Sequence, residues 1–149
     1  MTIRPRYLFF AFTAYLGAFL GFGVYTFIYA RGYSYLTEDP RACVNCHVMK
    51  EQYGGWVKAP HRNVAACNDC HTPHNLVGKY AVKAKNGFWH SYYFTTQTFK
   101  EPIQITKTGR KIALANCRRC HAPIVSAIDG PHKDSKRLDC LRCHQGVGH

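Results

Sequence analysis

All eight cysteines of this 149-residue chain belong to copies of one short pattern. In each copy two residues separate a pair of cysteines, and a histidine directly follows the second cysteine. Two cysteines at this spacing can form thioethers with the two vinyl groups of one haem, and the adjacent histidine can then bind the iron. The sequence therefore predicts four covalently bound haem c groups, attached at Cys43, Cys46 and His47, at Cys67, Cys70 and His71, at Cys117, Cys120 and His121, and at Cys140, Cys143 and His144.

Two other uses of paired cysteines explain less of the pattern. A disulfide framework needs an even number of cysteines, which this chain has, but it gives no reason for the histidines. A zinc ribbon also uses C-x-x-C pairs and would suit a basic nucleic-acid-binding protein, yet it does not require a histidine at that position either. With nine histidines in the chain, four chance matches have a probability of roughly one in 10⁵.

The N-terminal part of the chain is apolar over a length that suits a membrane. Residues 7–30 carry no charged side chain, and a helix of that length spans about 36 Å, against about 30 Å for a hydrocarbon core. The apolar run of a secretory signal is shorter, typically about 7–15 residues, and Ile28-Tyr29-Ala30 is a poor cleavage site. We therefore expect residues 1–30 to form a retained membrane anchor, with its transmembrane helix at about residues 7–30.

The charges before the apolar run predict the orientation of the anchor. Arg4 and Arg6 favour a cytoplasmic N-terminus, which places residues 31–149 across the membrane. Covalent haem attachment occurs on the periplasmic side of bacterial membranes, in agreement with this orientation. We therefore expect a single-pass protein of the bacterial cytoplasmic membrane with a periplasmic tetrahaem domain. Small residues in the anchor would allow two such helices to pack as a homodimer: Ala14, Gly17, Ala18 and Gly21.

Four haems on about 119 residues would themselves form most of the hydrophobic core of the periplasmic domain. No segment beyond the anchor shows the sustained alternation of a strand. We expect a mainly α fold with much irregular structure, organised around four covalent haems. The haem propionates would lower the formal net charge of +12 to roughly +8 with ferric iron and roughly +4 with ferrous iron. The basic composition therefore gives little support for nucleic-acid binding, and we predict no nucleic-acid partner.

The four motifs form two close pairs that resemble each other, which indicates an internal repeat. In each half a Pro-His dipeptide lies between the two motifs and another histidine follows the second motif. Low-spin haems need a second axial ligand, and we predict that His61, His132 and His149 supply it. His74 is close to its own motif and could instead hydrogen-bond to a propionate. The predicted halves and the segment that joins them are residues 43–75, residues 117–149 and residues 76–116.

Two further features concern the first haem. Met49 lies two residues after His47 and is the only methionine besides Met1; it could be an axial ligand or a packing residue. The joining segment interleaves aromatic residues with lysines, a composition typical of a membrane interface, although ordinary packing would also explain the aromatics. In that segment Lys83 or His90 could orient a quinol head group or accept its proton.

The anchor and the paired motifs resemble the NapC/NirT family of membrane quinol dehydrogenases over essentially the whole chain. The marks of the family are Cys43-x-x-Cys46-His47-x-Met49, Cys67-Asn-Asp-Cys70-His71-x-Pro73-His74-Asn75 and Cys140-x-x-Cys143-His144-x4-His149. The methionine two residues after the first motif is specific to the branch that forms the small subunit of cytochrome c nitrite reductase.

The resemblance implies a set of ligands. Met49 would bind the first haem in place of His47, while the proximal ligands of the other three haems would be His71, His121 and His144. His149 would reach the third haem and His61 the fourth, and Lys83 matches a position associated with the quinone pocket. The chain departs from some relatives at two positions. His90 replaces an aspartate that lies near the first haem in those relatives. His132 is available for the second haem, where some relatives use a lysine of the catalytic partner.

The resemblance also implies an activity. The chain would be a quinol dehydrogenase and electron-transfer subunit that oxidises menaquinol to menaquinone at the membrane. It would pass electrons to the catalytic subunit of a periplasmic pentahaem nitrite reductase and would not itself reduce nitrite. The same role for another periplasmic or extracellular reductase is an alternative. A stand-alone multihaem reductase is a third possibility, although the chain has no C-x-x-C-K motif.

Overall fold

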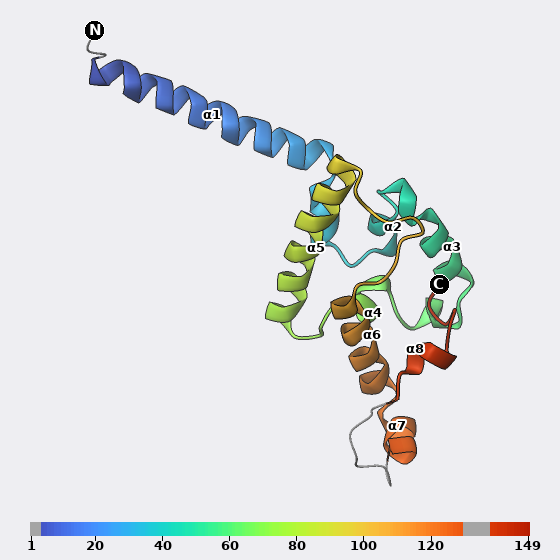
Figure 1. The fold of residues 1–149 in the computed structure, drawn as a ribbon. Helices are drawn as coiled ribbons and strands as arrows, with labels where there is room; N and C mark the ends of the chain where they lie inside the picture. Colours follow the sequence, from blue (N-terminus) through green and yellow to red (C-terminus); the bar gives the residue numbers. More distant parts are fainter. Residues whose placement is uncertain (1–3, 130–137) are drawn as a thin grey trace. The chain divides into compact units, whose positions relative to one another are not determined.

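The computed structural model describes residues 4–129 and 138–149, and within these ranges all regular structure is helical (Figure 1). The chain divides into two compact units, residues 1–34 and residues 35–149. The predicted class, mainly α with much irregular structure, is confirmed. The α-helices are Pro5–Tyr29 (α1), Pro40–Cys43 (α2), Lys50–Lys58 (α3), Cys67–His71 (α4), Leu76–Thr96 (α5), Lys107–Cys120 (α6), Ala122–Asp129 (α7) and Cys140–Cys143 (α8), and the 3₁₀ helices are Gly32–Leu36 (η1), His47–Met49 (η2) and Pro60–Asn63 (η3).

The first unit contains α1, which coincides closely with the predicted anchor. Among the described residues it is the one helix long and apolar enough to cross a membrane, with a mean hydropathy of 1.7. None of its residues is buried within the chain. Pro5 occupies its first turn, where the missing N–H of proline costs no hydrogen bond. The helix thus exposes apolar side chains on all sides, as a helix surrounded by lipid does.

In the second unit, α5 is longer than the short helices predicted from the sequence. Asn75 caps its N-terminus by accepting a hydrogen bond from the Gly78 N–H at 2.6 Å. Gln97 ends it in a left-handed conformation, with φ of 55°. Lys83 is the one buried residue of this helix, and most of its aromatic side chains are exposed. Sequence patterning did not reveal α5 because its apolar residues do not face a peptide core.

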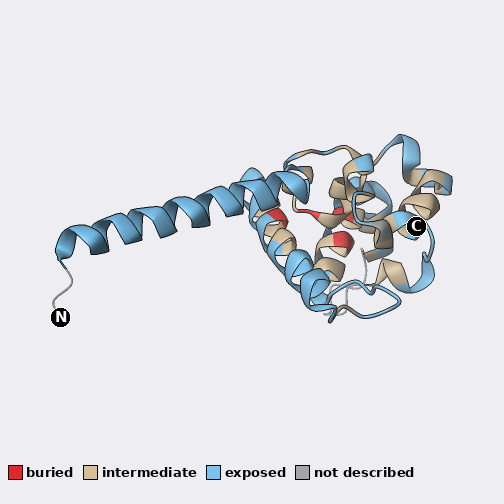
Figure 2. Ribbon diagram, turned by 90° about the horizontal axis from the view of Figure 1, so that it is seen from above, coloured by how far each residue is buried: buried red, intermediate tan, exposed pale blue. Residues whose placement is uncertain are grey.

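Residues 35–149 bury very little apolar surface of their own (Figure 2). Among the described residues Ala113 is the one buried apolar side chain, whereas Thr72, Lys83 and Asn116 are buried polar residues. A soluble domain of this size normally buries many large apolar side chains. This pattern fits the prediction that covalently bound haems contribute most of the apolar core.

The most extensive packing between helices of the second unit joins α4 to α6. Asn116 of α6 is buried, and its side-chain amide donates to the carbonyl oxygens of Cys70 and Thr72, both at 2.9 Å. These carbonyls lie at the C-terminal end of α4, where a helix has no intrahelical donors left. Asn116 therefore fixes the second cysteine motif against the helix that carries the third.

We expect Asn116→Ala to destabilise the haem-loaded protein by about 2–3 kcal/mol, because two carbonyl oxygens lose their donor in a buried position. Denaturant unfolding in detergent, followed by the Soret absorbance, measures the change. Asn63→Ala is the matched control, since Asn63 is exposed and its truncation should change stability by no more than about 0.5 kcal/mol. Equal effects of the two variants would contradict the role assigned to Asn116.

Candidate haem sites and a charged cluster beside the first motif

Each cysteine motif lies on a short helical segment. The first runs from the end of α2 to η2, the second occupies α4, the third ends α6 and the fourth occupies α8. Residues three apart on a helix project from neighbouring positions of one face, so both thiols of each helical motif can reach one ligand. All eight thiols are free of disulfide bonds. Among the described residues, no group of three or more histidine, cysteine or acidic side chains converges on a point that would suit a bare metal ion.

The motifs are neighbours in the order of the sequence. The thiols of Cys43 and Cys67 lie close enough to interact, and this interaction lowers the pKa of Cys43 to about 7 and raises that of Cys67. Burial raises the pKa of Cys70, and the nearby charge of Cys117 raises it further. Burial also raises the pKa of Cys117, and the charge of Cys140 acts in the same direction. The first motif therefore lies beside the second, the second beside the third and the third beside the fourth.

Two histidines outside the motifs lie beside motif histidines. The ring centres of His71 and His149 are 5.9 Å apart, and those of His61 and His121 are 6.0 Å apart. Two imidazoles that bind one metal ion from opposite sides have ring centres roughly 6 Å apart, because each metal–nitrogen bond is about 2 Å long. The spacing of both pairs therefore fits axial ligands of one haem each.

This arrangement differs from the pairing that the family resemblance implies. The resemblance assigns His149 to the third haem and His61 to the fourth, whereas the structure places His149 beside the second motif and His61 beside the third. His132 lies outside the described residues, as does the side chain of His47. Met49 is half-buried; it is the last residue of η2 and the N-cap of α3.

The C-terminal tail holds both histidine pairs. The Nδ1 of His61 donates to the Val147 carbonyl at 2.9 Å, so in the neutral tautomer the lone pair is on Nε2, the nitrogen that can bind a metal. Gly55 of α3 lies against the last residue: a methyl group there would be 2.9 Å from the Cα of His149. Glycine at position 55 is therefore required for the tail to lie where it does.

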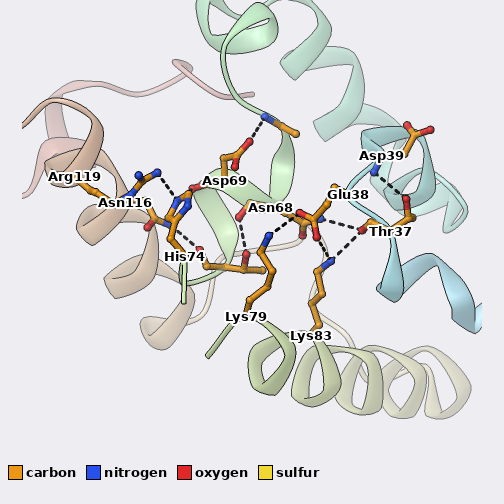
Figure 3. A network of polar contacts seen from close by, with 12 residues as sticks. Thr37, Glu38, Asp39, Asn68, Asp69, His74, Lys79, Lys83, Asn116 and Arg119 are labelled. Carbon is orange, nitrogen blue, oxygen red and sulfur yellow. Dashed lines mark hydrogen bonds and ion pairs between the residues drawn. The ribbon is translucent and has the colours of Figure 1, made fainter. Parts of the chain in front are cut away.

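His74 has different surroundings from the other spare histidines. Its Nε2 lies 3.1 Å from the Asp69 carbonyl oxygen and 2.7 Å from the Arg119 guanidinium (Figure 3). These two contacts alternate, since the first needs a proton on Nε2 and the second needs its lone pair. Both occupy the nitrogen that would otherwise bind a metal. A shallow cavity of about 290 Å³ lies next to His74 and Arg119.

A cluster of charged side chains lies beside the first motif (Figure 3). The buried Lys83 ammonium donates to Glu38 Oε1 at 2.7 Å and to the Thr37 carbonyl at 3.0 Å. Lys79 donates to the other oxygen of Glu38 at 3.1 Å. The hydrogen bond from Lys83 is the main cause of the lowered pKa of Glu38. Lys83 is close enough to the first motif that its charge contributes to the lowered pKa of Cys43.

His90 is also near the first motif, through Tyr35. The Tyr35 hydroxyl lies 2.9 Å from His90 Nδ1. Burial raises the pKa of Tyr35 to about 12, with smaller contributions from the charges of Cys46 and Cys43. Burial also lowers the pKa of His90. Lys83 and His90 are seven residues apart, so two turns of α5 bring them to one face of the helix.

Sequence reasoning identified Lys83 and His90 but missed their partners, Glu38 and Tyr35. Glu38 carried a signal, because it is one of only eight acidic residues against twenty basic ones and it lies just before the first motif. An isolated carboxylate in such a basic chain is expected to have a cationic partner. Tyr35 carried no such signal, since the chain has ten tyrosines.

We expect Gly55→Ala to displace the C-terminal tail and to disturb two haem sites at once. The haem content by mass should stay at the wild-type value, because no cysteine changes, while electron paramagnetic resonance should show low-spin signals converted to high-spin ones. Gly54→Ala is the matched control, since a methyl group at position 54 meets no atom within 4 Å. Wild-type spectra for Gly55→Ala would contradict the role of the tail.

We expect Glu38→Gln to lower stability near pH 7 by about 1–2 kcal/mol, because a buried ammonium loses its carboxylate although half of the Glu38 side chain is exposed. The pKa of Glu38 is depressed in the folded state. The stabilisation is therefore fully present above the unfolded-state pKa of about 4.3 and is lost as the pH falls through the folded-state pKa. Thermal unfolding at pH 7 and near pH 3 should show a difference from wild type that disappears in acid.

Lys79→Met is the control for the Glu38 prediction. It removes the outer partner of Glu38 and leaves the buried pair with Lys83 intact, so its effect should be smaller. A difference between Glu38→Gln and wild type that does not change with pH would contradict the assignment.

Comparison with known proteins identifies the family of this chain. The NapC/NirT cytochrome c family, N-terminal region, matches residues 5–149. The cytochrome c-type protein NrfH of Wolinella succinogenes is 35% identical over 157 aligned positions, which cover 98% of this chain and 88% of that protein. The cytochrome c nitrite reductase subunit NrfH of Nitratidesulfovibrio vulgaris is 31% identical over 80% of this chain and 72% of that protein.

A solved structure shares the fold. The crystal structure of the cytochrome c nitrite reductase NrfHA complex bound to the HQNO inhibitor contains a chain that matches with a TM-score of 0.65 and 28% identity, over 90% of this chain and 88% of that one. The haem c of such cytochromes is bound covalently through C-x-x-C-H motifs. Four such motifs lie within the matched region, and this chain belongs to the NapC/NirT cytochrome c family.

Proposed function

We propose that this protein is the membrane-anchored quinol dehydrogenase subunit of a cytochrome c nitrite reductase. In this proposal it oxidises menaquinol beside the first motif and passes electrons through four covalently bound haem c groups to a periplasmic catalytic subunit. Bound haem c supplies the one-electron chemistry of its iron. Nitrite reduction itself takes place on the partner.

The observation that carries this proposal is the unbroken succession of the four motifs. Contacts or close charges join Cys43 to Cys67, Cys70 to Cys117, and Cys117 to Cys140. Haems attached in this order would form one continuous row. A row with distinct ends suits a carrier that accepts electrons at one end and delivers them at the other.

The position of the first motif supports it as the end that receives electrons. Only five residues separate Tyr29, the last residue of α1, from Tyr35, and such a segment spans at most about 20 Å. Tyr35 is close enough to Cys43 and Cys46 for their charges to act on its hydroxyl. The first motif is therefore tethered near the boundary of the membrane that α1 crosses, where a lipid-soluble quinol is available.

The charged cluster suits the binding of a quinol head group. Oxidation of a quinol releases two protons with two electrons, so the site needs groups that bind its oxygens and accept protons. The Lys83 ammonium can donate a hydrogen bond to such an oxygen, and Glu38, half-exposed, connects it to solvent. His90, the other residue predicted for this site, contacts Tyr35 rather than the lysines.

The partner is proposed from the relatives. The Nitratidesulfovibrio vulgaris relative is named as a subunit of cytochrome c nitrite reductase, and the solved structure is a complex of that reductase. Their similarity covers 80% and 90% of this chain, respectively. The periplasmic side for residues 31–149 follows from Arg4 and Arg6 at the other end of the anchor.

The test of this proposal uses the intact complex, purified from membranes in mild detergent, with its subunits identified by mass. We expect a large multihaem cytochrome to co-purify and menaquinol oxidation to require nitrite. The assignment to nitrite respiration would be overturned if the protein co-purified with a different reductase or if menaquinol oxidation did not depend on nitrite.

Two lysine variants test the quinol site within the same complex. We expect Lys83→Met to slow menaquinol-dependent nitrite reduction by about ten- to a hundredfold, while Lys79→Met stays near wild type. Nitrite reduction driven by reduced viologen, which bypasses the quinol site, should be normal in both variants. Equal rates of menaquinol oxidation in Lys83→Met and Lys79→Met would remove Lys83 from the site.

A further inference from the structure

The histidines outside the motifs differ in which ring nitrogen the chain occupies. His61 uses Nδ1 to donate to the Val147 carbonyl, at 2.9 Å. His90 also uses Nδ1, which lies 2.9 Å from the Tyr35 hydroxyl. His74 instead has Nε2 in contact with its neighbours. The described residues thus leave Nε2 free of hydrogen bonds in His61 and His90 and occupied in His74.

This difference matters because histidines that bind a metal through Nε2 usually hold a hydrogen-bond partner on the other nitrogen. The partner fixes the tautomer and the ring orientation, and it makes the imidazole a stronger donor to the metal. His61 shows this pattern next to His121 of the third motif. His90 shows the same pattern, with a phenol oxygen in place of a carbonyl.

The contacts of Tyr35 place His90 at the first motif. The Tyr35 side chain lies near both cysteines of the first motif, Cys43 and Cys46. Its ring lies flat against α5 at Gly87, where a methyl group would be 3.6 Å from the ring carbons. Gly87 precedes His90 by almost one turn, so the aromatic ring and the hydrogen bond hold His90 from two points of one helix.

We propose that His90 is the second axial ligand of the haem attached at Cys43 and Cys46, and that Tyr35 is the residue that positions it. With Met49 as the predicted ligand on the other face, the first iron would be six-coordinate, without an open position. His149 and His61 are each paired with another motif, at His71 and His121, so His90 serves the first motif without competition from them. The proposal rests on covalent haem at the first motif and is independent of the electron donor and of the partner.

The test is spectroscopic and uses the full-length tetrahaem protein in detergent. We expect His90→Gly to convert one haem from low-spin to high-spin in electron paramagnetic resonance. The reduced variant should bind about one more carbon monoxide per chain than the wild type does. Added imidazole should occupy the site and restore the low-spin spectrum. His74→Ala is the matched control and should keep the wild-type spin states, because the chain already occupies its Nε2.

Tyr35→Phe tests the positioning of His90 separately from its ligation of the haem. It also keeps the proposal testable if His90→Gly does not fold. It should keep the first haem low-spin but raise its reduction potential, because an imidazole without a hydrogen-bond partner is a weaker donor to ferric iron. A merely structural role of Tyr35 would leave that potential unchanged. The proposal would be overturned if the wild-type protein already contained one high-spin haem that binds carbon monoxide and if His90→Gly left that haem unchanged.

Discussion

The structure depends on one constraint, which is that residues 35–149 cannot be held together by apolar burial of the peptide alone. Burial of apolar surface is normally the main favourable contribution to folding, and it must offset about 1–2 kcal/mol of backbone entropy for each ordered residue. Among the described residues of this unit, Ala113 is the one apolar side chain that is buried. Covalent haem would stabilise this unit in two ways: it adds a large apolar surface to the core, and it links two points of the chain through one rigid group.

The same constraint explains where the buried polar contacts lie. They hold the motifs themselves. Asn116 fixes the end of α4 to α6, and Lys83 with Glu38 fixes α5 beside the first motif. The Asn116 contact sets the separation of the second and third motifs, on which electron transfer between bound haems depends.

Haem attachment could be predicted from the sequence because it depends on short, local residue patterns. The four motifs, the apolar anchor and the family follow from residue spacing within a few positions. The long helix α5 could not be predicted, because hydrophobic periodicity reports a face that packs on peptide and α5 buries only Lys83. The partners Glu38 and Tyr35 lie 45 and 55 residues away in sequence from Lys83 and His90, and no local pattern records such contacts.

One backbone carbonyl connects the charged cluster around Lys83 to the second motif. The Thr37 oxygen accepts hydrogen bonds from Lys83 at 3.0 Å and from the Asn68 amide at 3.2 Å, and Asn68 lies within the second motif (Figure 3). A buried ammonium cannot leave its carboxylate unless another acceptor replaces it. The Lys83 ammonium has three N–H groups, and Glu38 and Thr37 accept hydrogen bonds from two of them, so the proposed quinol oxygen would accept from the third. Lys83 and Asn68 thus share one acceptor, so Thr37 joins the charged cluster to the second motif.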